Sequence, residues 1–126
     1  MEENISLFIK DMGIDSLEDI VGLYQDFMDE CNQLVLEIEK SFEENSFDMV
    51  FTEKLLHNLK GVSANLYVNE VFEKATILDD LLKTQDKNSY VYKEMFHLWQ
   101  QVLAAYTVAK VGIINYFLQR GYNLTS

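Results

Sequence analysis

Proline is missing from this sequence, so no proline kink or stop interrupts a long helix. Helix ends must therefore come from capping side chains and from the five glycines. Cysteine occurs once, as Cys31, which excludes a disulfide within the chain and indicates a buried thiol in a reducing compartment. Basic residues are also few, 10 against 21 acidic residues, and the net charge of −11 argues against nucleic acid or an anionic lipid surface as a partner.

Hydrophobic residues make up 48% of the chain, too many for a disordered acidic tail, so the chain is expected to fold. Its length of 126 residues suits one domain. We expect a single domain over residues 1–126, with a core bundle over about residues 16–120. The start Met1-Glu2-Glu3 lacks the basic residues and apolar run of a secretory signal, which favours a cytoplasmic location.

Apolar residues recur at steps of three and four along four long segments, the spacing of amphipathic helices. The residues expected to begin or end these segments are Gly13, Ser16, Asn45, Ser46, Asn69, Ser89 and Gly121. Ser16 and Ser46 are candidate N-terminal caps, and Gly121 is a candidate C-terminal cap. Short connections between long amphipathic helices favour antiparallel neighbours. The sequence therefore predicts an all-α, up-down-up-down four-helix bundle.

A short N-terminal helix, Ile5 to Met12, is expected to lie over one end of this bundle as a lid. The aromatic residues expected in the core are Phe47, Phe51, Phe72, Trp99, Tyr106 and Phe117. The segment from Val102 to Leu118 carries a single formal charge, but it is short for a membrane span and has polar flanks. We interpret it as a buried or partner-facing helix.

Two histidines occur in the chain, His57 and His97. The apolar residues that share one face of the second long helix are Phe51, Leu55, Leu59, Val62 and Leu66. At about 100° per residue, His57 points away from this face and toward solvent. Its neighbours on the outward side of the helix are Glu53, Lys60, Gly61 and Ala64.

Two of these neighbours bear on the chemistry of an exposed imidazole. Gly61 costs a helix about 1 kcal/mol relative to alanine, so its place beside His57 suggests close approach by a partner. Lys60 carries an ammonium that can neutralise a phosphoryl group attached to the imidazole. An alternative stays open on these residues alone: His57 and Lys60 are ordinary surface residues, and Gly61 admits a neighbouring helix.

The run from His57 to Leu66, HNLKGVSANL, resembles the signature of histidine-containing phosphotransfer (HPt) domains, in which histidine, any residue, leucine, lysine and glycine follow one another. The resemblance continues downstream at the apolar positions Val71, Ala75 and Leu78. Asp79 stands where the family frequently has glutamate, and Tyr67 departs from a frequent glycine, which leaves the turn into the third helix open.

The resemblance implies a four-helix bundle that works as a phosphorelay intermediate. His57 would accept a phosphoryl group from the aspartyl phosphate of a response-regulator receiver domain and pass it to another receiver, in a pathway fed by a sensor or hybrid histidine kinase. Imidazole is a competent nucleophile, so His57 needs no dedicated general base. Mg²⁺ would belong to the receiver, and we expect no cofactor or metal in this chain. No nucleotide-binding glycine loop is visible, so we expect a phosphoryl carrier without an ATP site and not an enzyme.

Docking is expected on the face around His57, formed by the first two long helices. The candidate docking residues are Glu53 and Ala64 with Leu36 and Val50, two apolar residues outside the core stripes. Stray surface hydrophobes are the alternative for the latter pair. For the whole chain, the alternative function is a non-transferring helical adaptor or dimerisation module. His97 has no second ligand at metal-binding spacing, and Ser63 has no triad partners, so neither predicts a site.

Overall fold

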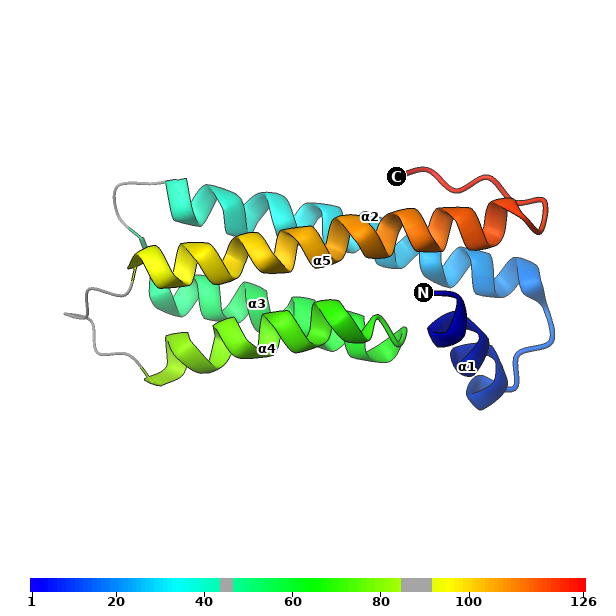
Figure 1. The fold of residues 1–126 in the computed structure, drawn as a ribbon, viewed down its shortest axis with the longest axis horizontal. Helices are drawn as coiled ribbons and strands as arrows, with labels where there is room; N and C mark the ends of the chain where they lie inside the picture. Colours follow the sequence, from blue (N-terminus) through cyan, green and yellow to red (C-terminus); the bar gives the residue numbers. More distant parts are fainter. Residues whose placement is uncertain (44–46, 85–91) are drawn as a thin grey trace.

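The computed structural model describes residues 1–43, 47–84 and 92–126. The helices in these ranges are α1 (Glu2–Met12), α2 (Leu17–Glu43), α3 (Met49–Asn65), α4 (Asn69–Thr84) and α5 (Tyr92–Leu118). Each helix from α2 to α4 packs against the next, and α5 also packs against α2, which closes the bundle. Figure 1 shows the four long helices side by side, with α1 at the end where α2 begins. The expected up-down-up-down four-helix bundle with a short N-terminal helix is confirmed.

The N-terminal caps are local side chains. Ser16 Oγ accepts a hydrogen bond from the backbone N–H of Asp19 at 3.3 Å, as its position ahead of α2 predicts. The helix α3 is capped by Asp48, whose carboxylate accepts from the N–H of Phe51 at 3.1 Å. The candidate cap Ser46, with Asn45 and Ser89, lies outside the described residues.

Two glycines end helices in the left-handed conformation that they adopt more easily than other residues. Gly13 ends α1 with φ 64°. Gly121 follows α5 with φ 89°, and its N–H donates to the carbonyl of Leu118 while the N–H of Tyr122 donates to that of Phe117. This pair of hydrogen bonds is the Schellman motif, and it confirms the expected C-terminal cap at Gly121.

The face of α3 that packs in the bundle differs from the predicted one. The expectation that Phe51 and Phe72 lie in the core is wrong, since they are 49% and 36% exposed. The buried residues of α3 are Thr52, Leu55, Leu56, Leu59 and Ser63, a face turned by about 55° from the apolar stripe. Thr52 can be buried here because its hydroxyl is hydrogen-bonded: Thr52 Oγ1 lies 2.9 Å from Ser41 Oγ of α2. Trp99, Tyr106 and Phe117 are buried as expected, and Phe47 is half-buried.

The long helix α5 supplies much of the core. Its buried residues are Met95, Trp99, Val102, Ala105, Tyr106, Ala109, Ile113, Tyr116 and Phe117. By length and composition it could also cross a membrane, but one buried face of a bundle gives the same composition. Lys110, its charge within the apolar run, lies over the Tyr106 ring and donates to Asn32 Oδ1 of α2. The opposite face leaves Val108 and Val111 exposed.

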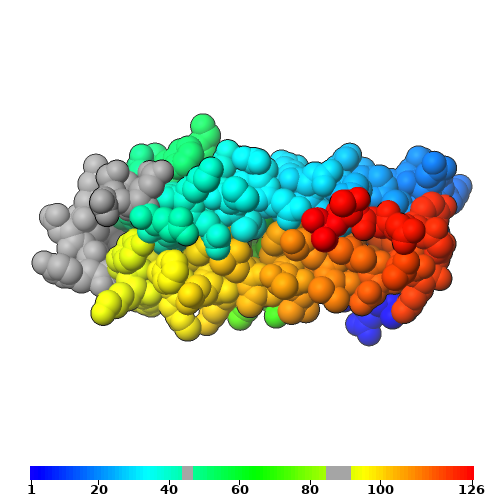
Figure 2. Space-filling view, turned by 90° about the horizontal axis from the view of Figure 1, so that it is seen from above, coloured from blue at the N-terminus to red at the C-terminus, as the bar shows by residue number. Residues whose placement is uncertain are grey.

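The two ends of the chain are held against the bundle. Phe8 of α1 packs edge-on against Tyr24 of α2 and Tyr67 of the α3–α4 turn, with ring centroids 5.6 and 5.5 Å apart. At the other end of the chain, the Gln25 side chain exchanges two hydrogen bonds with the backbone of Thr125, each 2.9 Å long. Figure 2 shows this C-terminal segment lying over the junction of α2 and α5.

Candidate functional site

The outward orientation predicted for His57 is confirmed. His57 is exposed near the middle of α3, and Gly61 follows it one turn later, also exposed. A Cβ built on Gly61 would meet no atom within 4 Å. Within the described part of the chain, therefore, no neighbouring helix requires a glycine at this position, and the close-packing alternative is wrong.

A shallow groove runs beside the imidazole, between α3 and α2. Its volume is about 280 Å³, and its lining residues are Glu30, His57, Asn58, Gly61, Val62 and Asn65. Only Glu30 comes from α2, so the groove is open along the exposed side of α3. The histidine is thus reachable from solvent by a group carried on another molecule.

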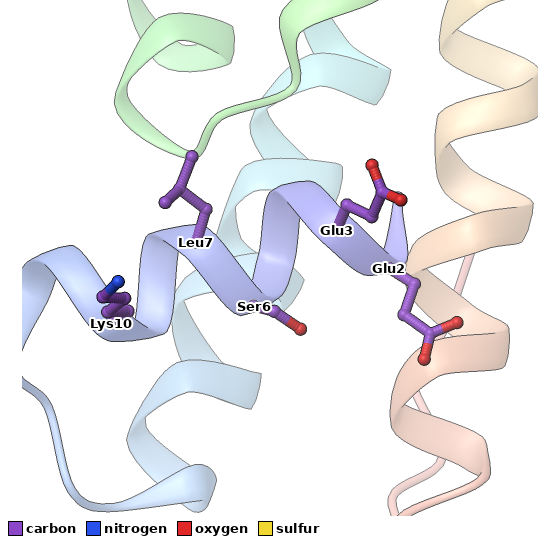
Figure 3. Close-up of a pocket in the computed structure, with 5 residues that line it drawn as sticks. All are labelled: Glu2, Glu3, Ser6, Leu7 and Lys10. Atoms are coloured by element: carbon purple, nitrogen blue, oxygen red, sulfur yellow. The ribbon is translucent and has the colours of Figure 1, made fainter.

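A second depression, of about 570 Å³, lies on the outer face of α1 (Figure 3). It is lined by Glu2, Glu3, Ser6, Leu7 and Lys10, and Figure 3 shows these side chains pointing in different directions along the helix. None of the candidate site residues predicted from the sequence lines it. Their divergence gives no focus for binding or chemistry, so His57 remains the centre of the candidate site.

Lys60 is directed toward α4. Its Nζ lies 3.0 Å from Oδ2 of Asp79, and its side chain is only 17% exposed. Lys83, one turn beyond Asp79 on α4, places its own Nζ 3.0 Å from the same oxygen and is 47% exposed. The Asp79 side chain is fully buried between the two helices. We refer to Asp79, Lys60 and Lys83 as the Asp79 cluster.

The comparison with known families agrees with this geometry. The family model for the Hpt domain matches residues 22–107, a region that contains His57, the groove and the Asp79 cluster. The chain belongs to the Hpt domain family. No curated protein and no solved structure matches the chain. Hpt domains are phosphocarrier modules without an ATP-binding site, and they work with kinases and receiver domains in phosphorelays. The helix α1 lies before the matched region.

The Asp79 cluster pairs two ammonium groups with one carboxylate. The cluster is structural, because a buried carboxylate that loses its partner costs roughly 3–5 kcal/mol. The hydrogen bond to Asp79 raises the pKa of Lys83, and the charge of Asp79 contributes in the same direction. The charges of Glu53 and Asp80 also raise the pKa of Lys83, so acidic groups outside the cluster offset its positive charge.

Two buried oxygens near the cluster have no hydrogen-bond partner among the described residues, Asp79 Oδ1 and Ser63 Oγ. Ser63 follows Lys60 by three residues and is fully buried. Both lysines therefore act on a single carboxylate oxygen, Oδ2, while the other oxygen is unpartnered within the described chain. Ser63 is a packing residue, as its lack of triad partners suggests.

Three of the four candidate docking residues lie along the outward side of α3. Val50 is 73% exposed, and Ala64 is exposed at the same spacing beyond His57. Glu53 is half-buried, and its charge raises the pKa of Lys83. This contribution is smaller than that of Asp79. Leu36 is 52% exposed but lies about 120° around α2 from Glu30, so the structure does not bring it to the groove. The docking roles stay predictions.

The partners of Lys60 were missed by sequence reasoning, which noted Asp79 only as a family position. Two signals were available. Asp79 falls in the apolar series of α4, between Leu78 and Leu82, where a carboxylate needs a cation. Lys83 follows it at i+4, the spacing of a helical ion pair. His97, by contrast, is exposed on α5 and lies 3.1 Å from the amide nitrogen of Gln101 in its own helix.

Proposed function

We propose that this Hpt domain is a phosphorelay intermediate: His57 accepts a phosphoryl group from the aspartyl phosphate of one receiver domain and passes it to the aspartate of another. The observation that carries the proposal is the exposed imidazole with open space at Gly61, one turn further along α3. An attacking group must approach phosphorus in line, and a bare helix surface allows a receiver to bring its phosphoryl group there.

The chemistry needs one nucleophile from this chain. A ring nitrogen of His57 attacks phosphorus, the bond between phosphorus and the aspartyl oxygen breaks, and the carboxylate leaves on the receiver. Return of the phosphoryl group to a second receiver reverses these bond changes. Mg²⁺ in the receiver's acidic pocket would neutralise the phosphoryl oxygens from one side, and Lys60 is proposed to do so from the other.

The proposed docking surface follows α3 on both sides of the imidazole. It comprises the groove with Glu30 and the exposed side of α3 with Val50, Glu53 and Ala64. The relay would begin at a sensor or hybrid histidine kinase in the cytoplasm, since this domain family has no ATP site of its own.

Transfer of radiolabelled phosphate tests the proposal. A labelled phospho-receiver is mixed, in the presence of Mg²⁺, with wild type, His57→Gln or His97→Gln. We expect acid-labile label on wild type and on His97→Gln, and none on His57→Gln. His97 is the matched control because it is also an exposed imidazole but lies outside the groove. Receivers that bind the wild-type chain without transferring label would support the adaptor function instead, for which the exposed Val108 and Val111 of α5 offer a contact surface.

A further inference from the structure

Two lysines form ion pairs with the single carboxylate of Asp79. Each lysine of the Asp79 cluster places its Nζ 3.0 Å from the same Oδ2 atom. The two ammonium groups are therefore at most about 6 Å apart and repel each other. One lysine is enough to balance the charge of the buried carboxylate, so the other can leave it. Glu53 and Asp80 also act on Lys83 and partly offset its charge.

We infer that Lys60 is bound to Asp79 while His57 is unphosphorylated, and that it moves to the phosphoryl group when His57 is phosphorylated. Lys83 then remains on Asp79 and balances the charge of its carboxylate. Asp79 and Lys83 would thus be positioning residues for Lys60. The inference rests on the proposed function, since it concerns the phosphorylated state of His57.

The placement of the two lysines decides which of them moves. Lys60 is on α3 itself, three residues after His57, so its side chain starts from the same helix surface as the imidazole. Lys83 is on α4, one turn from Asp79, and forms an i,i+4 pair that does not depend on α3. Departure of Lys60 leaves that pair intact, whereas without Lys83 it would leave a buried carboxylate with no cation.

The change of charge on His57 supplies the driving force. A phosphoryl group adds between one and two negative charges and three acceptor oxygens. Before phosphorylation, the buried Asp79 is the stronger partner for Lys60, which explains why its ammonium is bound there and only 17% exposed. After phosphorylation, the repulsion from Lys83 and the attraction of the phosphoryl oxygens act in the same direction. Loss of the phosphoryl group returns Lys60 to Asp79.

Phosphoramidate gives a test that needs no receiver. The bond between phosphorus and nitrogen in the reagent breaks, the phosphoryl group passes to a ring nitrogen of His57, and ammonia leaves. Formation rate and lifetime of phosphohistidine are measured for wild type, Lys83→Gln, Lys83→Arg and Lys74→Gln. Lys74→Gln is the matched control, because this substitution removes the same charge from the side of α4 that faces α5. Thermal unfolding checks that every variant is folded.

We expect Lys83→Gln to slow formation and shorten the lifetime by on the order of fivefold, since Lys60 must then stay on Asp79. Lys83→Arg should restore both, and Lys74→Gln should match wild type. In a Lys60→Ala background, Lys83→Gln should have no further effect. The lysine ammonium resonances should show Lys60 changing environment on phosphorylation and Lys83 remaining bound.

Three results would overturn the exchange of lysines: Lys83→Gln behaving as Lys74→Gln, an undiminished effect of Lys83→Gln in the Lys60→Ala background, or an unchanged Lys60 resonance in the phosphorylated protein. Failure of receivers to label a chain that phosphoramidate does label would count against the relay function alone. Failure of phosphoramidate to label His57 would count against both.

Discussion

At the scale of single residues, the site depends on the absence of a side chain at Gly61 as much as on the side chains that are present. Gly61 lies inside α3, where glycine is unfavourable, and open space surrounds the position of its missing Cβ. Nothing within the described chain gains from this glycine. Its cost to the helix is accounted for if a receiver must approach His57 closely along this surface.

Replacement of Gly61 by glutamine separates stability from transfer. Gly61→Gln should raise the free energy of unfolding by about 0.5–1 kcal/mol, through helix propensity, in urea titrations. It should also slow phosphoryl transfer from a phospho-receiver by on the order of tenfold, because the added side chain stands in the path of approach. Gly22→Gln is the control: Gly22 is another exposed helical glycine with open space around it, outside the groove. Equal transfer rates for the two variants would rule out the access role.

At the scale of elements, α1 and the α3–α4 turn depend on each other. Tyr67 in this turn has φ 60°, a left-handed conformation unusual for a tyrosine, at the position where the family frequently has glycine. Its hydroxyl donates to Asp11 Oδ2 at 2.6 Å, and its ring packs against Phe8, both from α1. Helix α1, which lies before the matched region, therefore holds Tyr67, the residue that departs from the family pattern.

The contact between Met1 and Gly112 offers a way to loosen α1. A Cβ on Gly112 would lie 2.9 Å from Met1 Cβ, so Gly112→Ala must displace the start of α1 from α5. We expect amide hydrogen exchange in α1 to accelerate by on the order of tenfold, with no such change in α3. Gly22→Ala provides the same propensity gain without the clash. If Gly112→Ala leaves exchange in α1 at the wild-type rate, as Gly22→Ala should, the contact of Met1 with Gly112 does not hold α1 in place.

At the scale of the whole molecule, three titratable groups of the core are held neutral in a strongly acidic chain. Burial raises the pKa of the Cys31 thiol to about 12, and the nearby Glu30 charge adds to the rise. Burial also raises the pKa values of Tyr24 and Tyr106, whose hydroxyls donate to the backbone carbonyls of Leu66 and Met28. All three groups are thus protonated in the folded chain at pH values where they ionise in the unfolded chain.

Stability should therefore decrease in alkaline solution. A group whose pKa is raised by folding stabilises the fold fully below its unfolded pKa and loses that contribution as pH rises toward its folded pKa. For Cys31 this window runs from about pH 9 to about pH 12. We expect the free energy of unfolding to fall by roughly 1 kcal/mol or more between pH 8 and pH 10, measured by urea titration. Cys31→Ala should reduce the slope, and a flat profile for wild type would contradict the burial of these groups as neutral species.

Periodicity and local capping were sufficient to predict much of this protein. Apolar spacing predicted the four long helices and the exposure of His57, and the caps at Ser16 and Gly121 lie where the sequence places them. These features depend on residues within one or two turns of each other, so they can be inferred without knowing which helix packs against which. The run around His57 likewise predicted the family that the match over residues 22–107 establishes.

Only the tertiary structure decided which groups meet across helices. It buried Thr52, whose hydroxyl is hydrogen-bonded to Ser41 of α2, and it left Phe51 exposed. It also directed Lys60 to Asp79 and brought α1 over Tyr67. Each outcome depends on the rotation of one helix relative to its neighbour, and an offset of about 55° is enough to exchange an inward residue for an outward one. The apolar spacing of a single helix does not determine that angle, because it is set by the side chains that the neighbouring helix presents.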